Sequence, residues 1–276
     1  MALRKTIAAD TAFVLNPTMR AILFLFIAAI LGFQPSHAAE TAFGFDDFLV
    51  APVRIHLLSA KDVPALHTTL VEADIQRILG KANKVWAAAG VHFHIESILK
   101  EEAVRQELFD KEAAKTELAW VKRHYPEKTR TTNAFNIYYI KQFGVNGVYF
   151  PDSIFVKDTA SLRKVEPGLD EPLPRVTSHE LGHALSLPHR QNVTNLMASG
   201  TSGFAFNADE IQRARAAAGK FGWIKPAKTL LAEADRLFDS GQKADALRIY
   251  QSLALLPLES PQLTQARQRL KAGPAR

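Results

Sequence analysis

The stretch that most constrains the fold is residues 179–189, which read HELGHALSLPH. His179 and His183 are four positions apart, so on an α-helix they lie next to each other on one face, with Cβ atoms about 5–6 Å apart. Pro188 cannot continue that helix, and the chain must leave the helix axis just before it. His189 can then turn back toward the other two imidazoles. The segment therefore predicts a helix, a bend and three converging histidines.

Three converging imidazoles are a metal-binding set. Their ring nitrogens can reach one ion at the ~2.0–2.1 Å that zinc requires, and three protein ligands leave a fourth position open, as in catalytic rather than structural zinc sites. Glu180 lies ~100° further around the helix, beside the metal rather than on it. There it can accept a proton from a water that zinc activates. The expected site has His179, His183 and His189 as zinc ligands and Glu180 as general base.

The same residues resemble the metzincin clan of zinc metalloproteases, nearest to its matrixin- and reprolysin-like members. The clan pattern is His-Glu-x-x-His-x-x-Gly-x-x-His followed by a methionine turn, and residues 195–198, NLMA, look like that turn. By this resemblance, Met197 lies under the zinc as a hydrophobic floor and does not bind it. The resemblance implies a zinc-dependent endopeptidase acting on protein or peptide substrates. It covers residues 50–222, with its specific motifs in residues 179–197.

The chain departs from the metzincin pattern at Ser186, where the family has a glycine. Glycine eases the turn between the second and third histidines, and serine fits there only if the backbone avoids a strained positive φ. In the family, an edge strand above the cleft pairs with the substrate backbone. Either residues 148–150 or residues 154–156 are expected to form that strand and to bind an extended peptide by β-augmentation.

Three alternatives stay open. Glu210 is a candidate third ligand, as in gluzincin-like peptidases, although it also completes a capping box with Asn207 at the start of a helix. His92 and His94 share one strand face and are candidates for a second metal, but an exposed polar alternation explains them more simply. The alternative from another functional class is a catalytically silent zinc-binding interaction protein, and an intact Glu180 argues against it.

The N-terminal residues have the layout of an export signal. Arg20 precedes an uncharged apolar run at residues 21–33, and small residues follow up to Ala38, which predicts a signal peptide of residues 1–38. The run is shorter than the ~20 residues of a membrane span, so no span is expected after cleavage. The chain has no cysteine, which excludes disulfides and thiolate metal ligands. We expect a periplasmic or secreted protein.

The charge of the chain does not indicate a nucleic-acid partner. The formal net charge is +6 at pH 7, but the basic residues are spread along the sequence and no nucleic-acid-binding motif accompanies them. The expected partner is therefore a protein or peptide substrate. With 47% hydrophobic residues, the chain can form one good-sized core and a small appendage.

The periodicity of apolar residues predicts both strands and helices. The expected strands are residues 48–58, 91–95, 136–141, 148–150 and 154–156. The expected helices are residues 70–88, 101–124, the motif helix, 207–218 and three short helices within 227–272. This alternation predicts an α+β fold, a mixed sheet with packed helices, in a zinc metalloprotease domain of residues 39–225.

Residues 226–276 are expected to form a helical appendage. The helix pair around Gly241 resembles one tetratricopeptide repeat, but a single repeat is below the three needed for a stable array. The segment is therefore either a packing appendage or a docking piece for a protein partner through residues 227–272.

Overall fold

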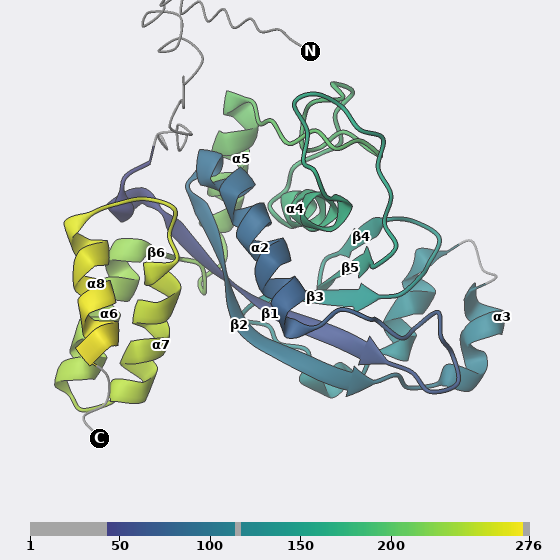
Figure 1. Ribbon diagram of the computed structural model, residues 1–276, viewed down its shortest axis with the longest axis horizontal. Coiled ribbons are helices and arrows are strands. Elements are labelled where there is room, and N and C mark those ends of the chain that lie inside the picture. The colour runs from purple at the N-terminus through teal and green to yellow at the C-terminus, as the bar shows by residue number, and fades with distance from the viewer. Residues whose placement is uncertain (1–42, 114–116, 273–276) are drawn as a thin grey trace, which may run out of the picture. The chain divides into compact units, whose positions relative to one another are not determined.

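The computed structural model describes residues 43–113 and 117–272 (Figure 1). The signal peptide expected at residues 1–38 lies outside the described residues. Within the described ranges, no helix combines the length and apolarity needed to cross a membrane. In chain order, the main elements are β1 (Leu49–Ser59), α2 (Glu72–Trp86), β2 (Val91–Glu102), α3 (Phe109–Ala113), β3 (Phe135–Ile140), β4 (Gly147–Phe150), β5 (Ser153–Lys157), α4 (Pro172–Ala184), α5 (Ala208–Ala218), β6 (Lys225–Pro226), α6 (Ala227–Asp239), α7 (Lys243–Ala254) and α8 (Pro261–Ala272).

The described strands form a six-stranded mixed sheet with the order β2-β1-β3-β5-β4, and the short β6 pairs with β1. β1, β2, β3 and β5 are parallel to their neighbours, whereas β4 is antiparallel to β5 and β6 is antiparallel to β1. β4 therefore forms one edge of the sheet, and β5 lies inside it. A mixed sheet with packed helices confirms the expected α+β fold.

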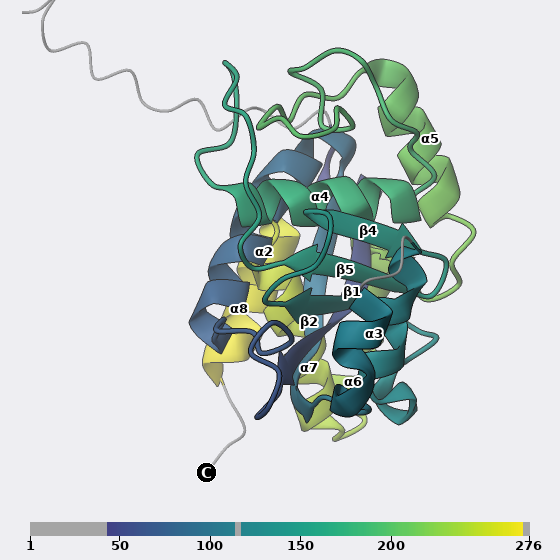
Figure 2. The same cartoon turned by 90° about the vertical axis from the view of Figure 1, so that its right-hand side faces the viewer.

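Helices α2 and α4 pack together over one face of the sheet (Figures 1 and 2). Alternate side chains of β1, such as Val53 and Ile55, point to this face because successive strand residues point to opposite sides. They share a core with Ile75 and Ile78 of α2 and Leu181 of α4. This core holds α4 against the sheet, and it thereby places the motif helix above β4 and β5.

The prediction of a helix at residues 101–124 is wrong. β2 continues to Glu102, paired with β1 as far as Ser59, and short helical turns follow, including α3 and the 3-10 helix Leu118–His124. Trp120 and Tyr138 are buried together on the sheet face opposite α2. Burial against the sheet overrides the helical periodicity of the sequence here.

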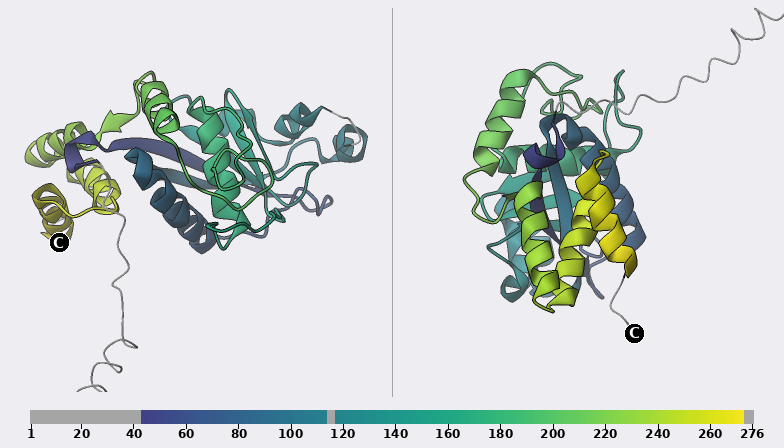
Figure 3. Two further views of the ribbon diagram at one scale, coloured as in Figure 1. Left: turned by 90° about the horizontal axis from the view of Figure 1, so that it is seen from above. Right: turned by 90° about the vertical axis from the view of Figure 1, so that its left-hand side faces the viewer.

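Helices α6, α7 and α8 pack side by side in the C-terminal part of the described chain (Figure 3). Their apolar sides form a cluster that also contains Phe45 and Phe48, from the beginning of the described chain. The Ala227 N–H donates to the Phe48 carbonyl at 2.8 Å. The three short helices expected within residues 227–272 are confirmed. The domain boundary at 225/226 and the likeness to a tetratricopeptide repeat stay predictions.

Candidate metal centre

Helix α4 carries the first two histidines and ends immediately after them. At its C-terminal end Ser186 has φ 65°, while its N–H donates to the His183 carbonyl and the Leu187 N–H donates to the Gly182 carbonyl, both at 2.9 Å. These two bonds form the Schellman arrangement, which ends a helix with a left-handed residue. The condition that serine fits here only without a positive φ is therefore wrong. The two bonds hold the turn in place, and the chain bends back toward α4.

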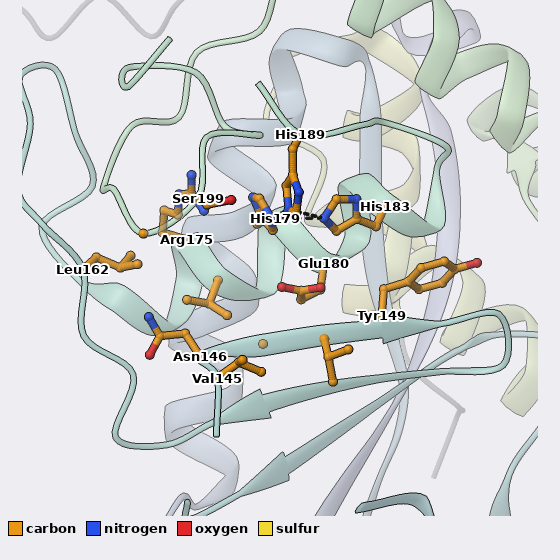
Figure 4. Close-up of a pocket in the computed structure, with 14 residues that line it drawn as sticks. Val145, Asn146, Tyr149, Leu162, Arg175, His179, Glu180, His183, His189 and Ser199 are labelled. Carbon is orange, nitrogen blue, oxygen red and sulfur yellow. Dashed lines mark hydrogen bonds between the residues drawn. The ribbon is translucent and has the colours of Figure 1, made fainter. Parts of the chain in front are cut away.

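This bend brings the three predicted histidines together (Figure 4). The Nε2 atom of His183 lies 3.1 Å from those of His179 and His189, which are 3.2 Å from each other. Two nitrogens bound at ~2.0–2.1 Å to one ion, at a tetrahedral angle, lie roughly 3.3–3.4 Å apart. Within the described residues, these side chains are the group whose ligand atoms are close enough together to hold a metal ion.

The hydrogen bonds of the imidazoles fix which nitrogen carries the proton. Nδ1 of His179 lies 2.9 Å from the Leu196 carbonyl, and Nδ1 of His183 lies 2.8 Å from the Leu187 carbonyl. A carbonyl only accepts, so Nδ1 must be protonated in both rings, and in a neutral imidazole Nε2 then carries a lone pair. Two such lone pairs at 3.1 Å cannot hydrogen-bond to each other. A cation between them resolves this contact, and the donor set fits a metal ion.

Burial favours the neutral form of His179 and His183, and metal-binding imidazoles must be neutral. It lowers the pKa of His179 to about 3, helped by the positive charge of nearby Arg175. It also lowers the pKa of His183. A neutral imidazole with its Nδ1 held by a carbonyl is the form that offers Nε2 to a metal.

Glu180 lies beside the three histidines and lines the same cavity, which has a volume of about 510 Å³ (Figure 4). Its side chain is buried, and this burial raises the pKa of Glu180 to about 8, with Arg175 opposing the rise. The carboxylate of Glu180 does not belong to the metal-binding group that the three histidines form. This is the position that the sequence predicts for a carboxylate that exchanges protons beside a metal.

Gly147 of β4 is a site residue that the sequence analysis missed. A Cβ atom at this position would lie 2.6 Å from Glu180 Oε1 and 2.7 Å from Val176 Cγ1, so only glycine leaves room for the carboxylate. The neighbouring residues Val148 and Tyr149 also line the cavity. β4 is thus both the sheet edge and a wall of the cleft, so residues 148–150, and not the interior residues 154–156, occupy the edge-strand position.

Met197 lies in the turn of residues 195–198, which packs under α4. It is fully buried, and a Cβ atom on Gly182 would lie 2.5 Å from its Sδ atom. The preceding residue, Leu196, accepts the bond from His179 Nδ1. The turn therefore both supports the helix between the first two histidines and orients the first imidazole.

Glu210, the alternative third ligand, is held away from the three histidines. Its carboxylate accepts bonds from Arg190 Nε at 2.7 Å, Asn195 Nδ2 at 2.7 Å and the Asn207 N–H at 2.9 Å. The Glu210 N–H in turn donates to Asn207 Oδ1 at 2.9 Å, which completes the predicted capping box. Glu210 thus ties the start of α5 to residues 190–195, and His189 completes the group instead.

His92 and His94 do not belong to a comparable group of ligands. His92 is buried, so the exposed alternation predicted for it is wrong. Neither of its ring nitrogens has a hydrogen-bond partner among the described residues. Burial lowers the pKa of His92 to about 3 and also lowers the pKa of His94. Within the described residues, no third ligand joins these two histidines to form a metal-binding group.

Arg175 is the second residue of the cavity wall that the sequence analysis missed. It lies four residues before His179 on α4, and a helix places such residues next to each other on one face. Its side chain is only 2% exposed and lines the cavity with His179 and Glu180. The helical spacing from His179 was the signal available in the sequence.

Comparison with known proteins adds a weak likeness to solved structures. No protein-family model matches the chain, and no curated protein matches it. Among solved structures, the chain is similar to a zinc-dependent peptidase from Methanocorpusculum labreanum (strain Z), at 12% identity over 60% of this chain and 98% of that one, with a TM-score of 0.29. A TM-score this low carries no functional argument, so the proposal below rests on the site.

Proposed function

We propose that the chain is a zinc-dependent endopeptidase that hydrolyses peptide bonds in protein or peptide substrates. The observation that carries this proposal is the geometry of the three imidazoles. Their Nε2 atoms lie 3.1–3.2 Å apart, two of the rings are oriented by backbone carbonyls, and a buried carboxylate lies in the same cavity. We assign His179, His183 and His189 as zinc ligands and Glu180 as general base.

The described residues divide the chemistry between them. When bound, a zinc ion supplies Lewis acidity that makes water a nucleophile near neutral pH and polarises a carbonyl. Burial alone raises the pKa of Glu180 to about 8, and the positive charge of a metal ion bound by the histidines would favour its carboxylate form. As the carboxylate, Glu180 would take a proton from the attacking water and deliver it to the amine nitrogen that leaves when the C–N bond breaks. The Leu196 and Leu187 carbonyls keep two imidazoles oriented, and Met197 provides an apolar support under the helix.

We further propose that the substrate binds as an extended strand along β4. Within the described residues β4 pairs only with β5, so its outer edge keeps unpaired backbone groups. Gly147, Val148 and Tyr149 line the cavity beside Glu180. A peptide that adds to this edge by β-augmentation would pass its backbone next to the three histidines.

The wider assignment follows from the sequence patterns. We propose that the chain is related to the metzincin clan, that residues 1–38 are a signal peptide and that the protein is periplasmic or secreted. We propose a catalytic domain of residues 39–225 followed by a helical appendage, tetratricopeptide-like around Gly241, whose residues 227–272 offer a surface to a protein partner.

The test is cleavage of casein and of a peptide library by the wild type and by Glu180→Gln, with zinc content measured in parallel. Both proteins are expected to bind about one zinc ion, while the variant loses roughly 10²- to 10⁴-fold in rate, the usual contribution of a general base. Equal, zinc-independent cleavage by both proteins would overturn the proposal. Zinc binding without cleavage by either would favour the catalytically silent interaction protein.

A second measurement separates the two candidate third ligands. Zinc content is compared for His189→Ala and Glu210→Ala. We expect the histidine variant to lose zinc and the glutamate variant to keep it, because Glu210 is bonded to Arg190 and Asn195. The reverse result would assign Glu210, and with it the gluzincin-like mechanism.

A further inference from the structure

The cavity beside the three histidines has a buried cation in its wall. The side chain of Arg175 is 2% exposed, and burial lowers its pKa only to about 10, so it is charged near neutral pH. Its Nε donates to the Gly203 carbonyl at 3.1 Å, and its Nη2 donates to the Ala198 carbonyl. Both acceptors are neutral carbonyls, one at the end of the methionine turn and one in the loop that follows it.

The remaining guanidinium nitrogen, Nη1, is available to a ligand. Nη1 has no hydrogen-bond partner among the described residues. It is also absent from the set of fully buried, unpartnered polar atoms, so solvent can reach it. Arg175 is one of the residues that line the cavity. In the view of Figure 4, Arg175 and Ser199 are drawn on the same side of the three histidines.

Among the described lining residues, the cavity offers this cation one carboxylate, Glu180. Glu180 is the carboxylate whose charge acts on Arg175, and the proposed mechanism already uses Glu180 for proton transfer. The other described lining residues carry no negative charge: Val145, Asn146, Gly147, Val148, Tyr149, Leu162, Val176, Ser199 and Gly200. A buried cation is costly unless it is paired, so an anionic group from outside would be bound favourably here.

We infer that Arg175 selects substrates that carry a carboxylate next to the scissile bond. This inference rests on the proposed function and adds the class of substrate. The side chain lies one helical turn, about 6 Å along the axis, before His179, so it is within reach of a residue adjacent to the bond that is cut. Nη1 donates to the substrate carboxylate in a charge-assisted hydrogen bond.

Two substrate groups provide this chemistry, an acidic side chain and the C-terminal carboxylate of a short peptide. The test measures kcat/KM of the wild-type protein for matched peptides with Asp or Glu against Asn or Gln at each position flanking the cleaved bond. A second pair has a free acid or an amide at its C-terminus. We expect at least about a tenfold preference for one of the acids, and the pair that shows it identifies the source.

The variants Arg175→Gln and Arg175→Lys separate substrate selection from a purely structural role in holding the loop. We expect the acid-to-amide ratio to fall toward one in the glutamine variant and to be partly kept in the lysine variant. Arg163→Gln is the matched control. The Arg163 side chain is exposed, and its backbone N–H donates to the Gly200 carbonyl in the same loop. Arg163 is not among the residues that line the cavity. Zinc content reports whether each variant is folded.

A binding measurement gives a readout besides activity. Calorimetry with N-acetylated dipeptides, acid against amide, should show the same preference in Glu180→Gln. Cleavage by the wild type without an acid preference would overturn this inference and leave the proposed function intact, as would a preference that Arg175→Gln retains or Arg163→Gln abolishes. No cleavage of any peptide would overturn the proposed function. If both Arg175 variants fail to fold, the acid-to-amide ratio of kcat/KM measured for the wild-type protein decides between the outcomes.

Discussion

Helices α4 and α7 bury their residues for different reasons. Most of α4 is buried, including the polar side chains of Arg175, His179 and Glu180. Arg175 and His179 donate hydrogen bonds to backbone carbonyls. α7 buries Tyr250 and Leu253 on one side and exposes most of the other. Burying polar groups stabilises a protein little even when they are paired. The sequence of α4 therefore serves a site, whereas that of α7 serves packing.

The largest effect is expected from removing a histidine of α4. His183→Ala should reduce bound zinc from about one ion per chain to near zero at micromolar metal, and should abolish cleavage. Altering even a residue that only orients a metal ligand costs 10- to 100-fold in affinity, and loss of the ligand itself costs more. Inductively coupled plasma analysis of the purified variant measures this. A His94→Ala control, outside the group of three histidines, should keep its zinc. Zinc at the wild-type level in His183→Ala would remove the basis of the site.

The opposite behaviour is expected in α7. Leu253 is fully buried in the cluster of α6, α7 and α8, so Leu253→Ala should cost about 2–5 kcal/mol of folding stability through lost burial and a cavity. Urea unfolding measures the loss, and zinc content and kcat/KM of the remaining folded protein should be unchanged. A large loss of activity at equal folded fraction would mean that the two regions are coupled.

Gly147→Ala tests whether β4 positions the carboxylate of α4. The added Cβ would lie 2.6 Å from Glu180 Oε1, and displacement of a catalytic group by 1 Å can cost about 10²-fold in rate. We expect a 10- to 100-fold fall in kcat/KM with zinc content unchanged. Gly144→Ala is the matched control, because its nearest contact would be Leu118 Cδ2 at 3.8 Å. Equal activity of both variants would show that Glu180 has room to move.

The smallest effect is expected at the turn that ends α4. Ser186 has φ 65°, a conformation that costs an L-residue about 1–2 kcal/mol, whereas glycine loses about 0.5–1 kcal/mol of chain entropy on folding. Ser186→Gly should therefore raise stability by roughly 0.5–1 kcal/mol and leave zinc content unchanged, as thermal unfolding of the metal-free protein would show. Destabilisation by this change would mean that the turn is not strained.

The sequence predicted those parts of the site that depend on local geometry. The spacing of His179 and His183, the break at Pro188 and the capping box of Glu210 each follow from a few consecutive residues. Gly147 was not predicted as a site residue, because its importance comes from contacts with another segment. The helical spacing of Arg175 from His179 was visible in the sequence, but its burial and its bonds to Gly203 and Ala198 depend on another segment. Residues 101–124 were misassigned for the same reason, since pairing with β1 and burial against the sheet outweigh their periodicity.

The most direct test of the central claim is a crystal structure of the zinc-loaded protein with anomalous data at the zinc edge. We predict one strong peak ~2.0–2.1 Å from Nε2 of His179, His183 and His189, with at least one further position open to solvent. A peak bound by Glu210, or one that leaves any of the three imidazoles unligated, would contradict the account.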